Sequence, residues 1–96
     1  MNEFFDALGK RWRKAASRRG VEIADPALDP KVAQEILELA RVVAHTSERR
    51  FAPLASYMAG ITAERLRQAK GADAEEIAAV VRDVREELER ETQSSG

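Results

Sequence analysis

The chain has 96 residues, no cysteine and a formal net charge of −1. This length suits one small domain, and the lack of cysteine excludes disulfides, thiolate metal ligands and cysteine nucleophiles. The sequence contains no apolar run of membrane-spanning length and no signal-peptide pattern, so we expect a cytoplasmic protein without a membrane span.

Apolar residues recur at helical spacing in four successive segments, and strand-like alternation is missing. The sequence therefore predicts an all-α protein, a compact bundle of four helices near residues 2–18, 30–45, 53–69 and 73–91. Asn2, Asp29 and Asp73 are the expected N-caps. We expect a single domain over residues 1–91 and a disordered tail at 92–96.

The first predicted helix is amphipathic and basic. Phe5, Leu8 and Trp12 share one side, where we expect them to pack into the bundle. Residues 1–20 carry a charge of +4, and the candidate basic surface consists of Lys10, Arg11, Arg13, Lys14 and Arg18. Helices of this kind lie on anionic membranes or bind nucleic acid. We favour packing within the bundle, because a domain this small needs three large apolar side chains for its core. The net charge of −1 also disfavours a nucleic-acid-binding function.

The second predicted helix begins at Asp29-Pro30, where Asp is an N-cap and Pro occupies the first helical position. Arg41 and His45 lie one turn apart on the face opposite its core stripe, which consists of Val32, Ile36, Leu39, Ala40 and Val43. His45 is the only histidine, and we expect it to interact with the negative end of the helix dipole. One histidine without cysteine does not indicate a metal site.

Arg49 and Arg50 lie just before the third predicted helix, whose N-terminal amides favour anions. Two interpretations remain open. Glu48 or Glu35 neutralises the arginines within the chain, or the loop binds a phosphate or carboxylate. The second interpretation makes Arg41, His45, Arg49 and Arg50 the candidate site for a ligand or partner.

The third predicted helix, residues 53–69, is expected to be central because two apolar stripes run along it. The larger stripe consists of Leu54, Tyr57, Met58 and Ile61, and the smaller one of Ala55, Ala59, Thr62 and Leu66. Gly60 lowers helix propensity by about 1 kcal/mol relative to alanine. We expect another backbone to approach closely there.

The fourth predicted helix follows a capping box made by Asp73 and Glu76. Its core stripe consists of Ile77, Val80, Val81, Val84 and Leu88. Residues 72–91 carry a charge of −5, and Glu86 is expected to pair with Arg82 and Arg90 one turn away.

The run LARVVAHTSERRFAPLASYMAG, Leu39 to Gly60, resembles a domain of unknown function common in actinobacteria. The resemblance covers about residues 29–90 and is carried by Leu39, Ala40, Arg41, Val43, Ala44, His45, Arg49, Ala52, Pro53, Leu54 and Gly60. This domain occurs alone or fused to molybdenum-cofactor guanylyltransferases, which join GMP to molybdopterin. Two features depart from the family pattern: Arg50-Phe51 replaces a small or proline-rich loop, and the first helix is basic. Guanylyltransferase chemistry requires a separate α/β domain, so the resemblance implies an accessory role rather than catalysis.

Catalysis is not expected on internal grounds either, because the sequence indicates no nucleophile–base pair and no buried carboxylate pair. We therefore expect a non-catalytic interaction module without a cofactor. Its partner is a protein, for which a molybdenum-cofactor guanylyltransferase is a candidate, and a homodimer is compatible with the sequence. The alternatives are a nucleic-acid-binding protein that uses the basic first helix and a binder of a small anionic ligand.

Overall fold

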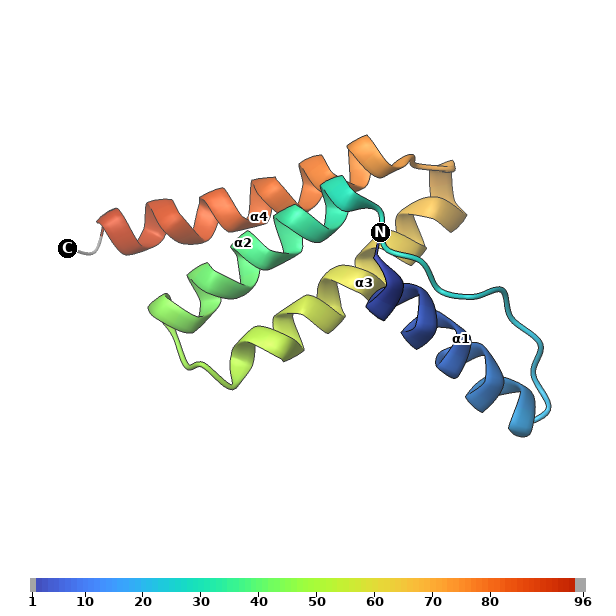
Figure 1. The fold of residues 1–96 in the computed structure, drawn as a ribbon. Coiled ribbons are helices and arrows are strands. Elements are labelled where there is room, and N and C mark those ends of the chain that lie inside the picture. The colour runs from blue at the N-terminus through green and yellow to red at the C-terminus, as the bar shows by residue number, and fades with distance from the viewer. Residues whose placement is uncertain (1, 95–96) are drawn as a thin grey trace. The chain divides into compact units, whose positions relative to one another are not determined.

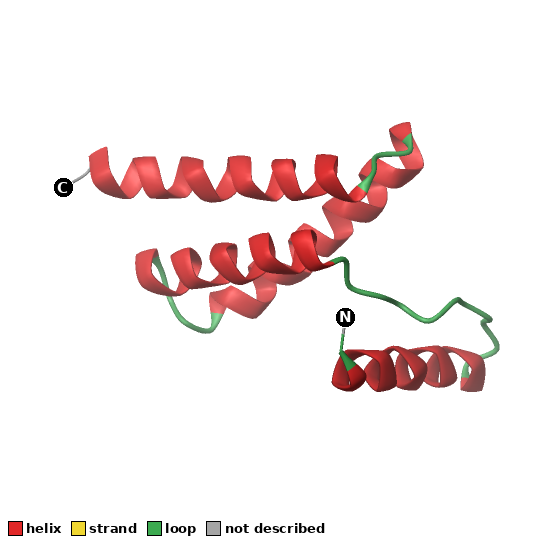
Figure 2. Cartoon of the chain, turned by 45° about the horizontal axis from the view of Figure 1, so that its top comes forward, coloured by secondary structure: helices red, strands yellow, loops and turns green. Residues whose placement is uncertain are grey.

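The computed structural model describes residues 2–94, and the side chains of residues 2–91. It contains four helices, α1 (Glu3–Arg18), α2 (Pro30–Thr46), α3 (Phe51–Lys70) and α4 (Ala74–Ser94) (Figure 1). No strand occurs within residues 2–94 (Figure 2). The predicted all-α class is confirmed. The tail predicted at 92–96 is helical as far as Ser94, and residues 95–96 lie outside the described part of the chain.

By its contacts the chain divides into two compact units, residues 1–30 and residues 31–96. The first contains α1 and the connector that follows it. The second contains α2 from Lys31 onward, α3 and α4. The single domain over residues 1–91 stays a prediction, and each unit is described by itself below.

In the first unit, α1 begins as predicted with the Asn2 side chain accepting a hydrogen bond from the Phe5 amide at 3.1 Å. It ends at Arg18, and Gly20 follows the C-cap residue Arg19 with a φ of +84°, which favours glycine. The connector returns along α1, where a Cβ on Gly9 would lie 2.5 Å from the carbonyl oxygen of Pro26. Trp12 remains 58% exposed, so the expectation that it is buried is wrong for this unit.

In the second unit, α2 and α4 lie side by side and run in the same direction (Figure 1). Helix α3 runs in the opposite direction and connects the end of α2 to the start of α4. One core cluster consists of Val32, Ala63, Ala72, Ile77 and Ala78. The other consists of Leu39, Val43 and Val81. Five α2 residues are buried, and Ile77 of α4 is only 1% exposed. The core of this unit is therefore made mainly by α2 and α4.

The expectation that the third helix is central is corrected by its burial. Leu54, Tyr57 and Met58 are 62%, 72% and 67% exposed, although we assigned them to the core. Ala63 is the buried residue of α3, and Ala55 and Ala59 pack against the second core cluster. Small side chains let α3 approach its neighbours closely, which leaves the larger stripe facing outward.

Gly60 lies on this outward region, and nothing lies within 4 Å of a Cβ built on it. The close backbone approach that we expected at Gly60 is therefore absent among the described residues.

A charged network joins α2 to α4. Glu35 accepts from Arg82 at 2.9 Å and from Arg85 at 3.5 Å, and Arg85 also donates to Glu89 at 2.7 Å. The Glu35 side chain is 14% exposed, so this carboxylate is largely shielded from water. Burial lowers the pKa of Arg85, but its bonds to Glu89 and Glu35 outweigh this and raise it. Arg82 therefore contacts the neighbouring helix rather than Glu86, its expected partner.

Candidate functional site

The candidate cluster predicted from sequence spans the end of α2 and the loop before α3. Arg41 and His45 are exposed residues of α2, and His45 lies in its last turn. Arg49 and Arg50 form the turn that precedes Phe51, the first residue of α3. No hydrogen bond or ion pair within residues 2–91 joins the side chains of the α2 pair to those of the loop pair, so their convergence on one anion stays a prediction.

Internal carboxylates already neutralise two of these side chains. The Arg41 guanidinium donates to Glu38 at 2.9 Å. The Arg50 guanidinium lies 3.4 Å from Glu48 and 5.6 Å from the centre of the Phe51 ring. Of the two counter-ions considered for the arginine loop, Glu48 has this role for Arg50, while Glu35 contacts α4. In the described chain, no ion pair engages Arg49 or His45.

The amides that open α3 are not available as an anion site. The Phe51 amide donates to the carbonyl oxygen of Glu48 at 3.0 Å, and the Ala52 amide to that of Arg49 at 3.1 Å. Pro53 has no amide hydrogen. Helix α3 begins two residues before the predicted start, which places the proline in the third helical position. An anion at this loop would have to depend on the guanidinium groups.

The candidate basic surface of α1 stays a prediction, although four of its five residues lie on one face of the helix. A shallow depression on α1 is lined by Ala7, Lys10, Arg11, Lys14 and Arg18. Arg13 does not belong to this face, because its Nε donates to Asp25 of the connector at 2.5 Å. No aromatic side chain lines the depression, so it lacks the stacking groups of a single-strand binding surface.

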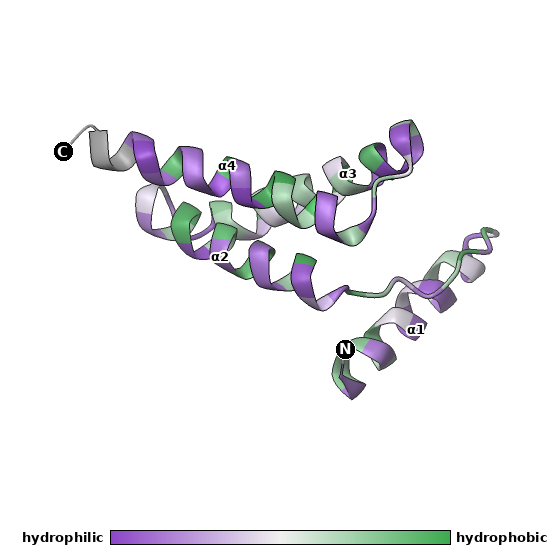
Figure 3. Cartoon of the chain, turned by 90° about the horizontal axis from the view of Figure 1, so that it is seen from above, coloured by the Kyte–Doolittle hydropathy of each residue, from purple (hydrophilic) through white to green (hydrophobic). Residues whose placement is uncertain are grey.

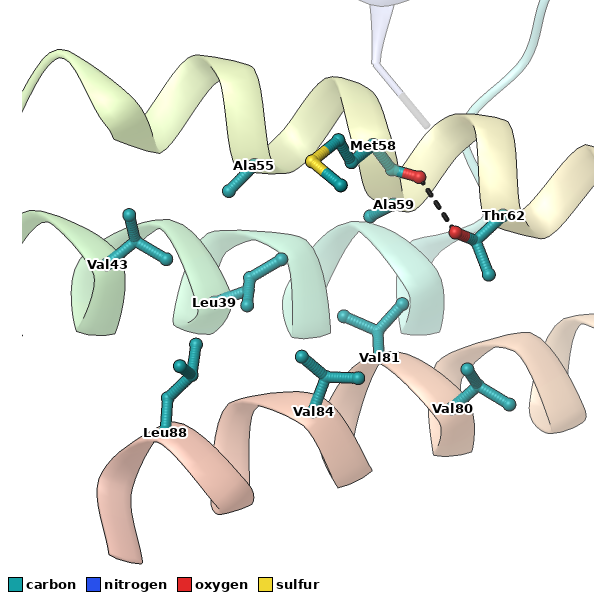
Figure 4. A pocket seen from close by; sticks show the side chains of 10 residues that line it. All are labelled: Leu39, Val43, Ala55, Met58, Ala59, Thr62, Val80, Val81, Val84 and Leu88. Atoms are coloured by element: carbon teal, nitrogen blue, oxygen red, sulfur yellow. Dashed lines mark hydrogen bonds between the residues drawn. The ribbon is translucent and has the colours of Figure 1, made fainter. Parts of the chain in front are cut away.

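The clearest concave feature of the second unit was not predicted from the sequence. A groove of about 240 Å³ lies between α3 and α4, with residues of α2 as its floor (Figure 4). The residues that line it are Leu39, Val43, Ala55, Met58, Ala59, Thr62, Val80, Val81, Val84 and Leu88. We call this feature the α3–α4 groove. It combines side chains from three helices, so no single apolar stripe in the sequence indicates it.

The groove has an almost entirely apolar lining. Its one side-chain hydroxyl, on Thr62, donates to the Met58 carbonyl oxygen of its own helix at 2.9 Å. Small-molecule sites usually enclose about 300–1,000 Å³ and converge several polar groups on the ligand. This groove is smaller and offers no free polar group to orient a cofactor, so it suits apolar side chains better than a polar ligand.

Within residues 2–94, no group of three or more histidine, cysteine or acidic side chains could hold a metal ion. In the same range, no helix is both long enough and apolar enough to cross a membrane.

The fold and its surfaces define a small all-α domain whose prominent features are an apolar groove and a basic helical face. The chain belongs to the family described as "Domain of unknown function (DUF6457)", which matches residues 5–95. The match includes α1, so it extends beyond residues 29–90, the range of the resemblance seen in the sequence. No curated protein and no solved structure matches the chain.

Proposed function

We propose that this domain is a non-catalytic protein-interaction module that acts in the biosynthesis of the molybdopterin-guanine dinucleotide cofactor. One observation carries the interaction role: α3 exposes a run of large apolar side chains, Leu54, Tyr57 and Met58, each more than 60% exposed. Contiguous exposed apolar side chains on a small domain are typical of binding surfaces. Tyrosine and methionine are also enriched at the centres of interfaces.

The link to the cofactor is supported by the sequence resemblance alone. The family resembled in residues 29–90 is also found fused to molybdenum-cofactor guanylyltransferases. A module that is fused in some proteins and separate in others is expected to bind the separate enzyme. The partner proposed here is therefore the guanylyltransferase of the same organism.

The test is a binding titration of the purified domain against that immobilised guanylyltransferase, with guanylyl transfer to molybdopterin measured in parallel. We expect saturable binding, weakened at least tenfold by Tyr57→Glu. Leu37→Glu is the matched control, because Leu37 is an equally large apolar residue that is 63% exposed on α2, outside the apolar surface of α3. Absence of binding at about 100 μM domain, or equal loss in both variants, would reject the proposal.

A further inference from the structure

Both walls of the α3–α4 groove carry apolar side chains. On the α3 side, Met58 lines the groove (Figure 4) and is 67% exposed. Leu54 and Tyr57 on the same helix are also exposed and extend the apolar surface of α3. On the α4 side, Val80 and Val84 line the groove, and Val84 is 46% exposed. A helix that lies in this groove could cover apolar residues on both walls.

Basic and acidic side chains of α4 lie on different sides of the helix. Arg82 and Arg85 point toward α2, since both contact Glu35. Asp83 and Glu87 are one turn apart on α4, and each lies three residues after a valine that lines the groove, Val80 and Val84 respectively. Both are exposed, and neither has an ion-pair partner within residues 2–91. Figure 3 shows the alternation of hydrophilic and hydrophobic residues along α4. The rim of the groove on this side is therefore acidic.

We propose that the α3–α4 groove binds a basic amphipathic helix of another protein, with apolar side chains in the groove and lysine or arginine against Asp83 and Glu87. This inference rests on the proposed interaction function and names the partner's chemistry. Charge complementarity selects the occupant, because an acidic helix would place like charges beside these two carboxylates.

The size of the groove fits such a helix. Its α4 wall extends from Val80 to Leu88, which corresponds to about 12 Å at 1.5 Å per residue. Two to three turns of a bound helix would therefore contact it. Apolar residues at i, i+3, i+4 and i+7 are the usual anchors of a helix in a groove.

Two labelled peptides of 18 residues are the probes. Both carry leucine at i, i+3, i+4 and i+7, and the remaining positions are lysine in one and glutamate in the other. Fluorescence anisotropy with the full chain should show the lysine peptide binding at least tenfold more tightly, with a preference that shrinks as salt is added. Equal binding of both peptides, or no binding of the lysine peptide, would overturn the proposal.

Variants of the full chain locate the contact. Asp83→Lys/Glu87→Lys should abolish the preference for the lysine peptide, and Met58→Glu should weaken binding of both peptides. Glu3→Lys/Glu86→Lys is the matched control, because it changes net charge equally at exposed residues that do not line the groove. Circular dichroism verifies that each variant folds. An equal effect of the control would show that only the overall field matters and would refute the site.

Self-association is measured by sedimentation velocity on the same samples. A dimer that Met58→Glu dissociates would show that a second copy occupies the groove, which contradicts a foreign partner. Failure of the peptide experiment with intact guanylyltransferase binding would reject this inference alone. Peptide binding without enzyme binding would reject the cofactor role and keep the groove.

Discussion

Glu35 of α2 accepts a hydrogen bond from Arg82 of α4 at 2.9 Å, across 47 residues of sequence. The Glu35 side chain is 14% exposed and that of Arg82 is 46% exposed, so the pair is neither fully buried nor fully solvated. With Arg85 on the same carboxylate, it fixes how α2 and α4 lie against each other.

Glu35→Gln should therefore destabilise the fold by about 1–2 kcal/mol, between the small value of exposed pairs and the large cost of breaking buried ones. Glu38→Gln is the control on the same helix, because Glu38 pairs only with exposed Arg41, and it should change stability by less than about 0.5 kcal/mol. Urea unfolding followed by circular dichroism measures both. Equal losses in the two variants would contradict the structural role of Glu35.

Ile77 and Ile61 distinguish the core from the surface of the second unit. Ile77 is 1% exposed within the first core cluster, so Ile77→Ala should cost about 2–5 kcal/mol. Ile61 is only partly buried and belongs to neither cluster, so Ile61→Ala should cost clearly less, about 1 kcal/mol. Chemical unfolding of both variants ranks them. A larger loss of stability in Ile61→Ala than in Ile77→Ala would show that α3 is the central helix.

The sequence predicted the helices well because their ends and faces are local features. Asn2 and Asp73 cap α1 and α4 by bonds to amides three residues on, at 3.1 and 2.9 Å. The sequence could not show which face of α3 is buried, because both apolar stripes of this helix have helical spacing. It also could not find the partner of Arg82, since Glu86 is near in sequence and Glu35 is near only in the folded unit.

The candidate sites show the same division. The basic face of α1 follows from spacing along one helix, and four of its five predicted residues line one depression. Arg13 departs from it because the connector brings Asp25 within 2.5 Å. The α3–α4 groove depends on how three helices pack, so periodicity along one segment contains no signal for it.

Gly60 provides a test of whether the outward face of α3 is free in the isolated chain. Nothing lies within 4 Å of a Cβ at this position, so Gly60→Ala should stabilise the protein by about 0.5–1 kcal/mol through helix propensity. Gly9→Ala is the contrasting variant, because its Cβ would lie 2.5 Å from the Pro26 carbonyl oxygen. It should lower stability. Thermal melts compare them, and a destabilised Gly60→Ala would show that another backbone contacts α3.

The basic face of α1 should not bind duplex DNA specifically. Lys10, Arg11, Lys14 and Arg18 offer phosphate contacts, but contacts of this kind carry no sequence information. Gel-shift titrations at low salt with two unrelated duplexes should show at most weak binding, equal for both. Tight binding to one duplex that weakens steeply with salt would favour the nucleic-acid function instead.

The last prediction concerns Arg49 and Arg50, which are exposed in the turn before α3. The turn is closed by backbone bonds from the Phe51 and Ala52 amides, so these side chains do not hold it. Arg49→Ala/Arg50→Ala should therefore change stability by less than about 0.5 kcal/mol, as exposed substitutions usually do. The double variant should nevertheless weaken binding to the guanylyltransferase, since it removes the Arg49 guanidinium and the exposed Arg50 guanidinium, which Glu48 contacts at 3.4 Å.

Arg18→Ala/Arg19→Ala is the matched control for this prediction, because it removes the same charge from exposed residues of the first unit. Binding titration and thermal unfolding of both double variants separate the two roles. Weaker enzyme binding by the loop variant alone, at unchanged melting temperature, supports a contact at the arginine loop. Normal binding with a much lower melting temperature would show that Arg49 and Arg50 are structural. Equal weakening of enzyme binding by both double variants would show that only the net charge of the protein matters.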